Sequence, residues 1–299
     1  MSFPLVSICI PTYNGAKYLQ QALDSILSQT YKNIEVVISD DASEDETLDI
    51  IKAFEETAPL PVKVNFHQPT GIGANWNNSM AGASGEYIKF LFQDDVLLPD
   101  CIKEMVAVLQ ENNGVALVAS KRKFIVQEEM DSPETEKWMQ TFGDLQAHLH
   151  LPEKNINIFD KSLFKSPVFY SKPTNKIGEP SAVMFRKSVI KKIGFFDLEL
   201  KQTLDYEYWY RILKHHKIAI INKPLVQFRL HGAQATNINR DQQIPDYEFY
   251  PKILYKHYFW LLHPQLQKQL FKKYNRGYKF YVRVRNKLKR AIKSYKWSK

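Results

Sequence analysis

Hydrophobic and polar segments alternate regularly over the first 120 residues of the chain. Short runs of apolar and β-branched residues predict strands, and a longer stretch with helical spacing follows almost every run. Alternation with short connections predicts an α/β fold in which a mostly parallel, doubly wound sheet is buried on both faces. The predicted strands are 5–10, 34–39, 62–67, 87–92 and 115–120, and the predicted helices are 16–29, 44–57, 71–83 and 99–111.

This alternation is lost after residue 120. The next segment contains an acidic, proline-containing stretch, and we interpret it as a loop or insertion. No linker rich in proline, glycine or serine marks an independent second domain further along. The insertion covers 121–175, regular patterns return at 179–189, a helix is predicted over 204–215, and strands are predicted over 218–221 and 226–230.

Polar residues follow three of the predicted strands. They are Thr12-Tyr13-Asn14, Asp40-Asp41 and Asp94-Asp95. A single Asp-Asp pair at the end of a strand would usually cap a helix or form a turn. The carboxyl ends of parallel strands meet at one edge of the sheet, where such folds bind ligands. Three polar groups at this edge therefore predict a functional site.

The composition is that of an ordinary globular protein. Hydrophobic residues make up 44% and charged residues 24%, which is enough apolar material for a core. Two cysteines, Cys9 and Cys101, are too few for a disulfide framework and fit a reducing compartment. No apolar run approaches the ~18 residues of a membrane span, and the first residues lack the basic segment of a signal peptide. We therefore expect a cytoplasmic protein, either free or peripheral on the inner face of the plasma membrane.

The net charge of +9 is concentrated in the C-terminal tail. Thirteen Lys and Arg residues lie within 265–299, and no acidic residue follows Glu248. The rest of the chain has 28 basic and 32 acidic residues, a balance of −4. Because the basic character belongs to the tail alone and no nucleic-acid-binding module accompanies it, we expect no nucleic acid as a partner.

Apolar residues in this tail recur at three- and four-residue steps, with Arg285 interrupting the series, which is helical periodicity. A basic amphipathic helix can lie on an anionic membrane, where each cation contributes ~1 kcal/mol. A helix packed on its own domain with a solvated basic face explains the pattern equally well. The apolar residues of the series are Phe271, Tyr274, Tyr278, Tyr281, Leu288, Ile292 and Tyr295.

The common phosphate-binding loops are absent. Residues 11–15 do not form Gly-x-Gly-x-x-Gly, which disfavours a dinucleotide oxidoreductase, and there is no Walker A loop. Carboxylates at strand ends instead suit Mg²⁺ or Mn²⁺, which prefer oxygen ligands and would neutralise a departing nucleoside diphosphate. Asp205, at the start of a predicted helix, is the candidate base for an incoming nucleophile, although an aspartate in this position is more often a helix cap.

The ordered motifs of the chain resemble those of family 2 glycosyltransferases. The similar segments are 6–14, 27–31, 38–43 and 85–91 with Asp94-Asp95, and then Glu179-Pro180-Ser181, Asp205 with Trp209 and Arg211, and Arg229-Leu230-His231. The resemblance covers roughly residues 4–235. It implies an inverting, nucleotide-sugar-dependent enzyme of the GT-A fold.

The resemblance also implies a division of the chain and a reaction. Residues 1–120 would form the nucleotide-sugar-binding half, 121–235 the acceptor-binding half including the insertion, and 236–299 a helical, basic C-terminal extension. The sugar would pass to a hydroxyl of a glycan or lipid-linked acceptor, as bacterial surface polysaccharide assembly requires. UDP is the favoured nucleotide because Asp41 suits the imide N–H of uracil. Thymine presents the same edge, and GDP donors occur in the family.

Individual roles follow from the matching positions. Tyr13 would stack on the nucleobase, and Asp205 would deprotonate the acceptor hydroxyl. His231 would reach the metal or the diphosphate, although a lone histidine is more often a structural hydrogen-bonding group. The implied nucleotide site is Pro11, Thr12, Tyr13, Asn14, Asp41, Gly71, Asn75 and Asp94; the implied metal ligands are Asp95 and His231; and the residues near the donor sugar or acceptor are Glu179, Pro180, Ser181, Trp209 and Arg211.

Two positions depart from the family pattern. Phe92 stands where many relatives carry the first carboxylate of Asp-x-Asp-Asp, so metal binding would depend more heavily on Asp95. Residues 75–78 lack the basic residue that many relatives place after the glycine-rich turn, so the diphosphate would be held by amide donors or by charge from elsewhere. Trp76 in this segment is expected to serve packing rather than chemistry.

Two other classes of protein remain as alternatives. One is a nucleotide-sugar-binding protein without turnover, for which the role of Asp205 would discriminate. The other is a sugar-phosphate nucleotidyltransferase, which would need a glycine-rich, basic loop directly after the first strand; residues 12–15 do not supply one.

Overall fold

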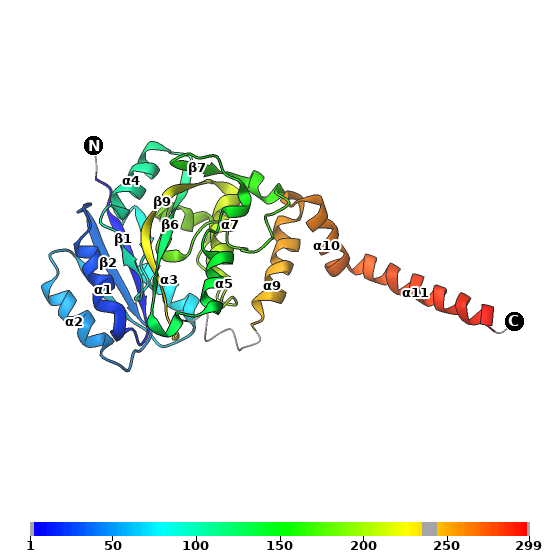
Figure 1. Ribbon diagram of the computed structural model, residues 1–299, viewed down its shortest axis with the longest axis horizontal. Helices are drawn as coiled ribbons and strands as arrows, with labels where there is room; N and C mark the ends of the chain where they lie inside the picture. Colours follow the sequence, from blue (N-terminus) through cyan, green and yellow to red (C-terminus); the bar gives the residue numbers. More distant parts are fainter. Residues whose placement is uncertain (1–2, 235–243, 298–299) are drawn as a thin grey trace.

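The computed structural model describes residues 3–234 and 244–297, with side chains as far as residue 288. These residues form one nine-stranded sheet in the order β3-β2-β1-β4-β8-β6-β9-β5, with β7 pairing with β9 (Figure 1). The strands are β1 Val6–Thr12, β2 Ile34–Asp40, β3 Val62–Phe66, β4 Tyr87–Phe90, β5 Val96–Leu97, β6 Val115–Val126, β7 Ile156–Phe159, β8 Val183–Arg186 and β9 Lys217–Leu230.

The sheet is mostly parallel, as predicted. Strands β3, β2, β1 and β4 run in the same direction. β6 and β9 also pair in parallel, from Val115 beside Lys217 to Val126 beside Leu230, with register shifts near Ser120. β8 lies antiparallel between β4 and β6 and joins the two parallel groups. The short strands β5 and β7 are antiparallel to β9.

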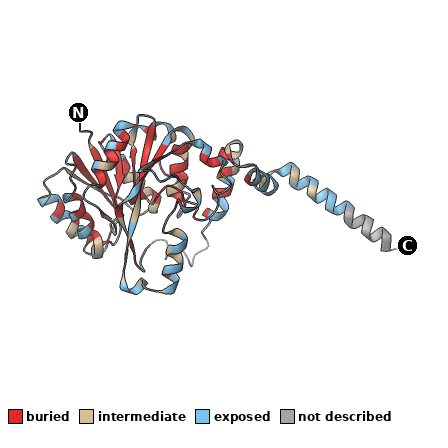
Figure 2. Ribbon diagram, turned by 45° about the horizontal axis from the view of Figure 1, so that its top comes forward, coloured by how far each residue is buried: buried red, intermediate tan, exposed pale blue. Residues whose placement is uncertain are grey.

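Helices cover both faces of the sheet, which explains why the first strands are rich in apolar residues (Figures 1 and 2). Successive residues of β1 enter opposite cores: Ile8 and Ile10 join one, and Cys9 joins the other. The helices are α1 Ala16–Leu27, α2 Thr47–Thr57, α3 Ile72–Gly82, α4 Cys101–Glu111, α5 Pro133–Phe142, α6 Ile190–Ile193, α7 Leu204–His215, α9 Asp246–Ile253, α10 Pro264–Tyr274 and α11 Arg276–Trp297.

The segment 121–175, interpreted as a loop or insertion, contains regular secondary structure. β6 continues to Val126, and the segment also contains α5 and β7. The acidic stretch 127–137 that suggested a loop contains a short 3-10 helix and the first half of α5. Two basic residues before it form ion pairs: Lys121 contacts Asp144, and Arg122 contacts Glu179. The two strands predicted over 218–221 and 226–230 are likewise parts of the single strand β9.

The C-terminal extension has two parts of different character. α9 and α10 pack on the core that α7 covers, with Tyr250, Leu254, Leu266 and Leu270 buried there. α11 leads away from the body of the protein (Figure 1). No helix in the ranges that the structure describes is long and apolar enough to cross a membrane. The predicted boundary at 235/236 and the side chains of Ile292 and Tyr295 lie outside the described residues.

Candidate active site

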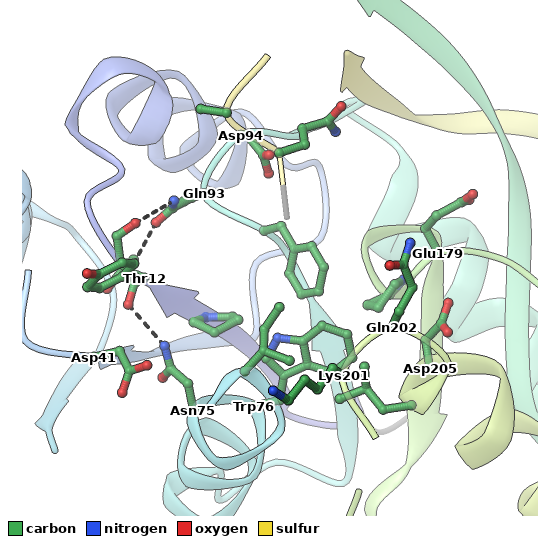
Figure 3. A pocket seen from close by; sticks show the side chains of 18 of the residues that line it. Thr12, Asp41, Asn75, Trp76, Gln93, Asp94, Glu179, Lys201, Gln202 and Asp205 are labelled. Carbon is green, nitrogen blue, oxygen red and sulfur yellow. Dashed lines mark hydrogen bonds between the residues drawn. The ribbon is translucent and has the colours of Figure 1, made fainter. Parts of the chain in front are cut away.

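A cavity of about 440 Å³ lies where the first strands end, between the loops after β1 and β4 and the start of α7 (Figure 3). Its size is typical of a small-molecule site. Ten of the sixteen site residues predicted from the sequence line this cavity: Pro11, Thr12, Tyr13, Asp41, Asn75, Asp94, Glu179, Pro180, Asp205 and His231.

One end of the cavity is built by the loops after β1 and β2. The Thr12 hydroxyl donates to Asp40 Oδ2 at 2.7 Å, and Ser43 donates to the same carboxylate, so Asp40 holds the loops together. This leaves the neighbouring Asp41 to line the cavity. Burial raises the pKa of the Asp41 carboxyl, and His67, with Nε2 3.3 Å from Asp41 Oδ1, opposes that rise.

Tyr13 stands at the mouth of this end. Its side chain is 54% exposed, whereas its backbone is fixed by Gln93: Gln93 Oε1 accepts from the Tyr13 N–H at 2.9 Å, and Gln93 Nε2 donates to the Tyr13 carbonyl at 3.0 Å. A Cβ on Gly15 would lie 2.2 Å from Gln93 Oε1, so only glycine permits this close approach. A rigid backbone with an exposed ring suits stacking on a planar ligand.

Asn75, in the first turns of α3, closes the same end. Its amide donates to the Thr12 carbonyl at 3.0 Å, which ties the helix to the end of β1 (Figure 3). α3 begins after Gly71, whose φ of 107° favours glycine. Gly71 itself does not line the cavity, so its contribution is to start the helix that carries Asn75 and Trp76.

The loop after β4 brings Asp94 against the end of β9. His231 Nε2 lies 2.9 Å from Asp94 Oδ2, and both residues line the cavity. Arg229 fixes this arrangement, because its backbone N–H donates to Asp95 Oδ1 at 3.0 Å and its Nε donates to the Asp94 carbonyl at 2.8 Å. Sequence reasoning assigned no role to Arg229, although it named the motif that contains it.

Asp95 lies behind this pair and does not line the cavity. Only 1% of the residue is exposed, and its Oδ2 is buried with no hydrogen-bond partner. Burial and the neighbouring Asp94 carboxylate raise the pKa of Asp95. Ser181, also predicted to be near the reacting sugar, accepts from the Phe92 N–H at 3.0 Å and therefore positions the same loop from outside the cavity.

At the opposite end, Asp205 is the second residue of α7, and Thr203 rather than Asp205 occupies the N-cap position. Asn175 donates to Asp205 Oδ2 at 2.9 Å, whereas Oδ1 is buried without a hydrogen-bond partner. Burial raises the pKa of Asp205 to about 7, with the nearby Glu179 charge contributing. A carboxylate with a pKa near neutrality and a free oxygen is suited to general base chemistry.

Glu179 lies at this end of the cavity with its charge already paired. Arg122 Nη2 is 2.9 Å from Glu179 Oε1, and the Arg122 side chain is 4% exposed. The guanidinium also lies over Phe124, 4.9 Å from the ring centroid. Glu179 is therefore held by an ion pair through Oε1, whereas Asp205 has no ion pair among the described residues; each keeps one buried oxygen without a hydrogen-bond partner.

Three further predicted residues lie away from the cavity. Asn14 holds its own loop, donating from its backbone to Ser43 and accepting from the Glu44 N–H. Trp209 is fully buried, with Nε1 3.0 Å from the Gly178 carbonyl. Arg211 pairs with Glu207 and donates to the carbonyls of Ile193 and Phe195, so it braces α7 and not a ligand.

The structure adds lining residues that sequence reasoning missed. Trp76 packs against Phe92, with ring centroids 4.9 Å apart, and both also line the cavity. The other additions lie in loops, at the first residues of α3 and α7, or in β9, and no motif distinguishes them as ligand-facing. They are Ile72, Gln93, Lys201, Gln202, Leu204, Phe228, Ala233 and Gln234.

The fold is of the GT-A glycosyltransferase type, and comparison with known sequences identifies the family. The profile of the family described as "Glycosyl transferase family 2" matches residues 7–194, more than half of the chain, so the protein belongs to this family. An uncharacterised glycosyltransferase of Rickettsia typhi is 31% identical over 245 residues, covering 82% of this chain and 70% of that protein. One from Rickettsia prowazekii matches to the same extent.

Solved structures share the fold. TarS of S. aureus (residues 1–349) in complex with UDP-GlcNAc superposes with a TM-score of 0.64 at 21% identity, covering 94% of this chain and 76% of that one. The mannosyltransferase PcManGT of Pyrobaculum calidifontis, in complex with GDP-Man and Mn²⁺, gives 0.54 at 17% identity, covering 91% and 75%. At these identities the likeness establishes the GT-A fold alone.

Proposed function

We propose that this glycosyltransferase transfers a sugar from a UDP-sugar to a hydroxyl of a glycan or lipid-linked acceptor, with inversion at the anomeric carbon. The observation that carries the proposal is the layout of the cavity. Tyr13 and Asp41 offer a stacking ring and a hydrogen-bond acceptor at one end, and Asp205 offers a base at the other. A donor spanning the cavity would place its anomeric carbon toward Asp205.

The reaction is a single displacement. Asp205 takes the proton of the acceptor hydroxyl, the acceptor oxygen forms a bond to the anomeric carbon, and the bond from that carbon to the phosphate oxygen breaks with UDP leaving. Attack from the face opposite to the leaving group inverts the configuration. Asn175 orients Asp205 through its 2.9 Å hydrogen bond and leaves Oδ1 for the hydroxyl.

A divalent cation fits the residues between the two ends. Two carboxylates and an imidazole are donors that Mg²⁺ or Mn²⁺ accept, and Asp95 Oδ2 is a buried oxygen lacking a partner. Asp94, Asp95 and His231 would hold the ion, which would neutralise the negative charge of the diphosphate. No cluster of three His, Cys, Asp or Glu side chains is preassembled for a metal among the described residues, so Asp95 would have to turn toward the cavity.

UDP is preferred to CMP and ADP because of Asp41. Asp41 Oδ1 has no hydrogen-bond partner, although His67 lies 3.3 Å away, and it can accept the imide N–H of uracil. The cytosine and adenine edges place an acceptor nitrogen there, whereas guanine also presents an N–H. dTDP presents the same edge as UDP and is the second candidate. The UDP-GlcNAc bound in the TarS structure supports a uridine donor in this fold, and the GDP-Man bound in PcManGT makes GDP the comparison of most interest.

The nucleotide is tested by thermal unfolding with UDP, dTDP, GDP, ADP and CMP, each with Mn²⁺ or with EDTA. A ligand that binds only the folded protein at ~100 times its Kd adds ~2.7 kcal/mol of stability. We expect UDP to stabilise the protein most, and more with Mn²⁺ than with EDTA. Stabilisation by GDP alone would overturn the assignment of Asp41 to uracil, and no shift with any nucleotide would favour the alternative of a protein without turnover.

For the acceptor, we propose a lipid-linked glycan at a membrane surface, as bacterial surface polysaccharide assembly would present it. The described side chains of α11 place Phe280, Tyr281, Val284 and Leu288 within one stripe along the helix, each 41–68% exposed. Lys and Arg occupy nine of the other eighteen positions of α11, and no acidic residue is present in this helix. An apolar stripe flanked by cations matches an interfacial helix on anionic lipid.

Vesicle sedimentation tests this surface. We expect the full chain to pellet with phosphatidylcholine vesicles containing anionic lipid and to remain in solution with neutral vesicles. Replacing Arg283 and Lys287 by glutamine removes two cations, which lowers partitioning by roughly thirtyfold at ~1 kcal/mol each. The matched control replaces Lys52 and Lys103, exposed lysines on α2 and α4. Equal recovery in the supernatant with both vesicle types would exclude a membrane role for α11.

A further inference from the structure

The cavity is rich in carboxylates and poor in fixed positive charge. Asp41, Asp94, Glu179 and Asp205 line it, and a diphosphate would add more negative charge. His231 contacts Asp94, and the one guanidinium at the Glu179 end is occupied by that carboxylate. Among the lining residues that the structure describes, Lys201 is the only Lys or Arg.

The side chains at the start of α3 offer little to bind the negative charge of a diphosphate. It has no basic residue, and the amide nitrogens of its three asparagines already donate within the protein. Asn75 donates to the Thr12 carbonyl, Asn77 to the Phe196 carbonyl and Asn78 to Ser39, at 2.8–3.0 Å. The asparagine amides of α3 are therefore poor candidates for holding the diphosphate.

The loop that carries Lys201 packs directly against this part of α3. A Cβ on Gly73 would lie 3.3 Å from Leu204 Cδ1 and 3.5 Å from Leu198 Cδ2, so the loop and the helix touch. Lys201 is exposed to solvent, lines the cavity, and lies between Asn75 and Asp205 in Figure 3. A cation here stands between the nucleotide end and the catalytic base.

A buried carboxylate from the C-terminal extension fixes the loop. Asp246, the first residue of α9, is fully buried. It accepts the backbone N–H of Lys201 at 3.0 and 3.1 Å, that of Gln202 at 2.7 Å and that of Thr203 at 2.8 Å. Charge-assisted hydrogen bonds to three successive N–H groups hold the loop in one conformation at the entrance to α7.

We propose that Lys201 binds the diphosphate of the donor and that Asp246 is the positioning residue that presents it. The inference rests on the proposed function. Lys201 thereby provides the positive charge that the start of α3 lacks, and it does so from a segment more than 120 residues further along the chain. The side chain can follow the diphosphate as it leaves, since its exposed ammonium group has no ion pair among the described residues that would restrain it.

The test compares UDP with uridine by calorimetry in wild type, Lys201→Ala and Lys201→Arg, each with EDTA so that no metal contributes. A lost charge-assisted contact to phosphate is expected to weaken UDP binding about 10- to 100-fold in Lys201→Ala. Uridine has no phosphate and should bind all three proteins equally, while Lys201→Arg should keep most of the affinity for UDP. Lys52→Ala is the control for loss of an exposed cation.

The outcomes separate the two proposals. If wild type binds UDP and Lys201→Ala binds it equally well, the role of Lys201 is refuted while the proposed function stands. If wild type binds no uridine nucleotide in this test or with Mn²⁺, the proposed function itself fails. If Lys201→Ala weakens uridine as much as UDP, the residue shapes the cavity and does not bind phosphate.

Asp246→Asn tests the positioning role. The asparagine keeps the size of the side chain but removes the charge that accepts three N–H groups. We expect UDP affinity to fall and uridine affinity to remain, as in Lys201→Ala, and the double variant to be no weaker than Lys201→Ala alone. Additive losses in the double variant would show that Asp246 acts independently of Lys201. Should Asp246→Asn fail to fold, the Lys201 variants still decide the proposal.

Discussion

Replacing Asp205 by asparagine is expected to reduce sugar transfer by about a thousandfold while leaving UDP affinity nearly unchanged. The amide cannot accept the proton of the acceptor hydroxyl, and general base catalysis contributes on the order of 10²–10⁴ in rate. The nucleotide end of the cavity is built by other residues, including Tyr13 and Asp41, so donor binding does not depend on the base. Release of UDP measured with and without acceptor, beside calorimetry with UDP, checks both halves of the expectation.

The pH dependence of the wild-type enzyme provides an independent check on the same residue. Burial raises the pKa of Asp205 to about 7, so the ionised form required of a base is lost as the pH falls below that value. We expect kcat/KM to drop about tenfold per pH unit on the acid side. A rate that stays constant from pH 8 to pH 5 would be incompatible with Asp205 as the base.

The folded state of the asparagine variant serves as the control. Because the pKa of Asp205 in the folded protein lies above its unfolded value, ionisation of this group lowers stability as the pH rises from about 4 to 7. The neutral asparagine avoids this loss. The variant should therefore unfold at the same or a higher temperature than wild type at pH 8, so lost activity could not be ascribed to lost structure.

Replacing Trp209 by alanine is expected to lower the free energy of unfolding by about 3–5 kcal/mol. The side chain is fully buried among Phe185 and Phe196, and its indole N–H donates to the Gly178 carbonyl. Urea denaturation measures the loss. Trp260→Ala is the matched control, because that residue is 85% exposed and should change stability by less than about 0.5 kcal/mol. Equal effects of the two substitutions would contradict the assignment of Trp209 to the core.

Trp209 also supports the site indirectly, through the segment 174–178. Its contact at Gly178 and the hydrogen bond from Tyr210 to the Thr174 carbonyl hold the segment that presents Asn175 to Asp205. The resemblance implied that Trp209 lies near the donor sugar or acceptor. In the structure Trp209 does not line the cavity and is linked to Asp205 through the segment that carries Asn175. Trp209→Phe, which keeps an aromatic ring and loses the N–H, should retain more stability than Trp209→Ala.

The first half of the fold was predictable because β1, β2 and β4 are buried along their whole length and a helix follows each of the first strands directly in the chain. Ile8, Cys9 and Ile10 enter opposite cores, so three successive residues are apolar and the segment cannot be mistaken for a surface loop. The strand-end motifs then located Thr12, Asp41 and Asp94 on one edge. A carboxylate at each of two strand ends was sufficient to locate the cavity.

The second half was less predictable because its polar residues are paired across long distances. Lys121 and Arg122 follow the predicted strand 115–120, yet they belong to β6 and pair with Asp144 and Glu179. Lys223-Pro224 divided β9 into two apparent strands, although it is one strand that bridges β5, β6 and β7. Lys201 and Asp246 carry no local pattern at all, since their hydrogen bonds join positions 45 residues apart.

The dependence of the loop at 201–203 on Asp246 has a consequence for biosynthesis. A nascent chain that has emerged as far as residue 234 already contains every described residue that lines the cavity, but it lacks the carboxylate that fixes the loop and the side chains of Tyr250 and Leu254 that cover the aromatic core. Because translation delivers α9 after the other elements that shape the cavity, a ribosome-bound intermediate that lacks α9 has the lining residues without the carboxylate that fixes their loop. The loop at 201–203 is therefore expected to reach its final conformation only once α9 has been synthesised.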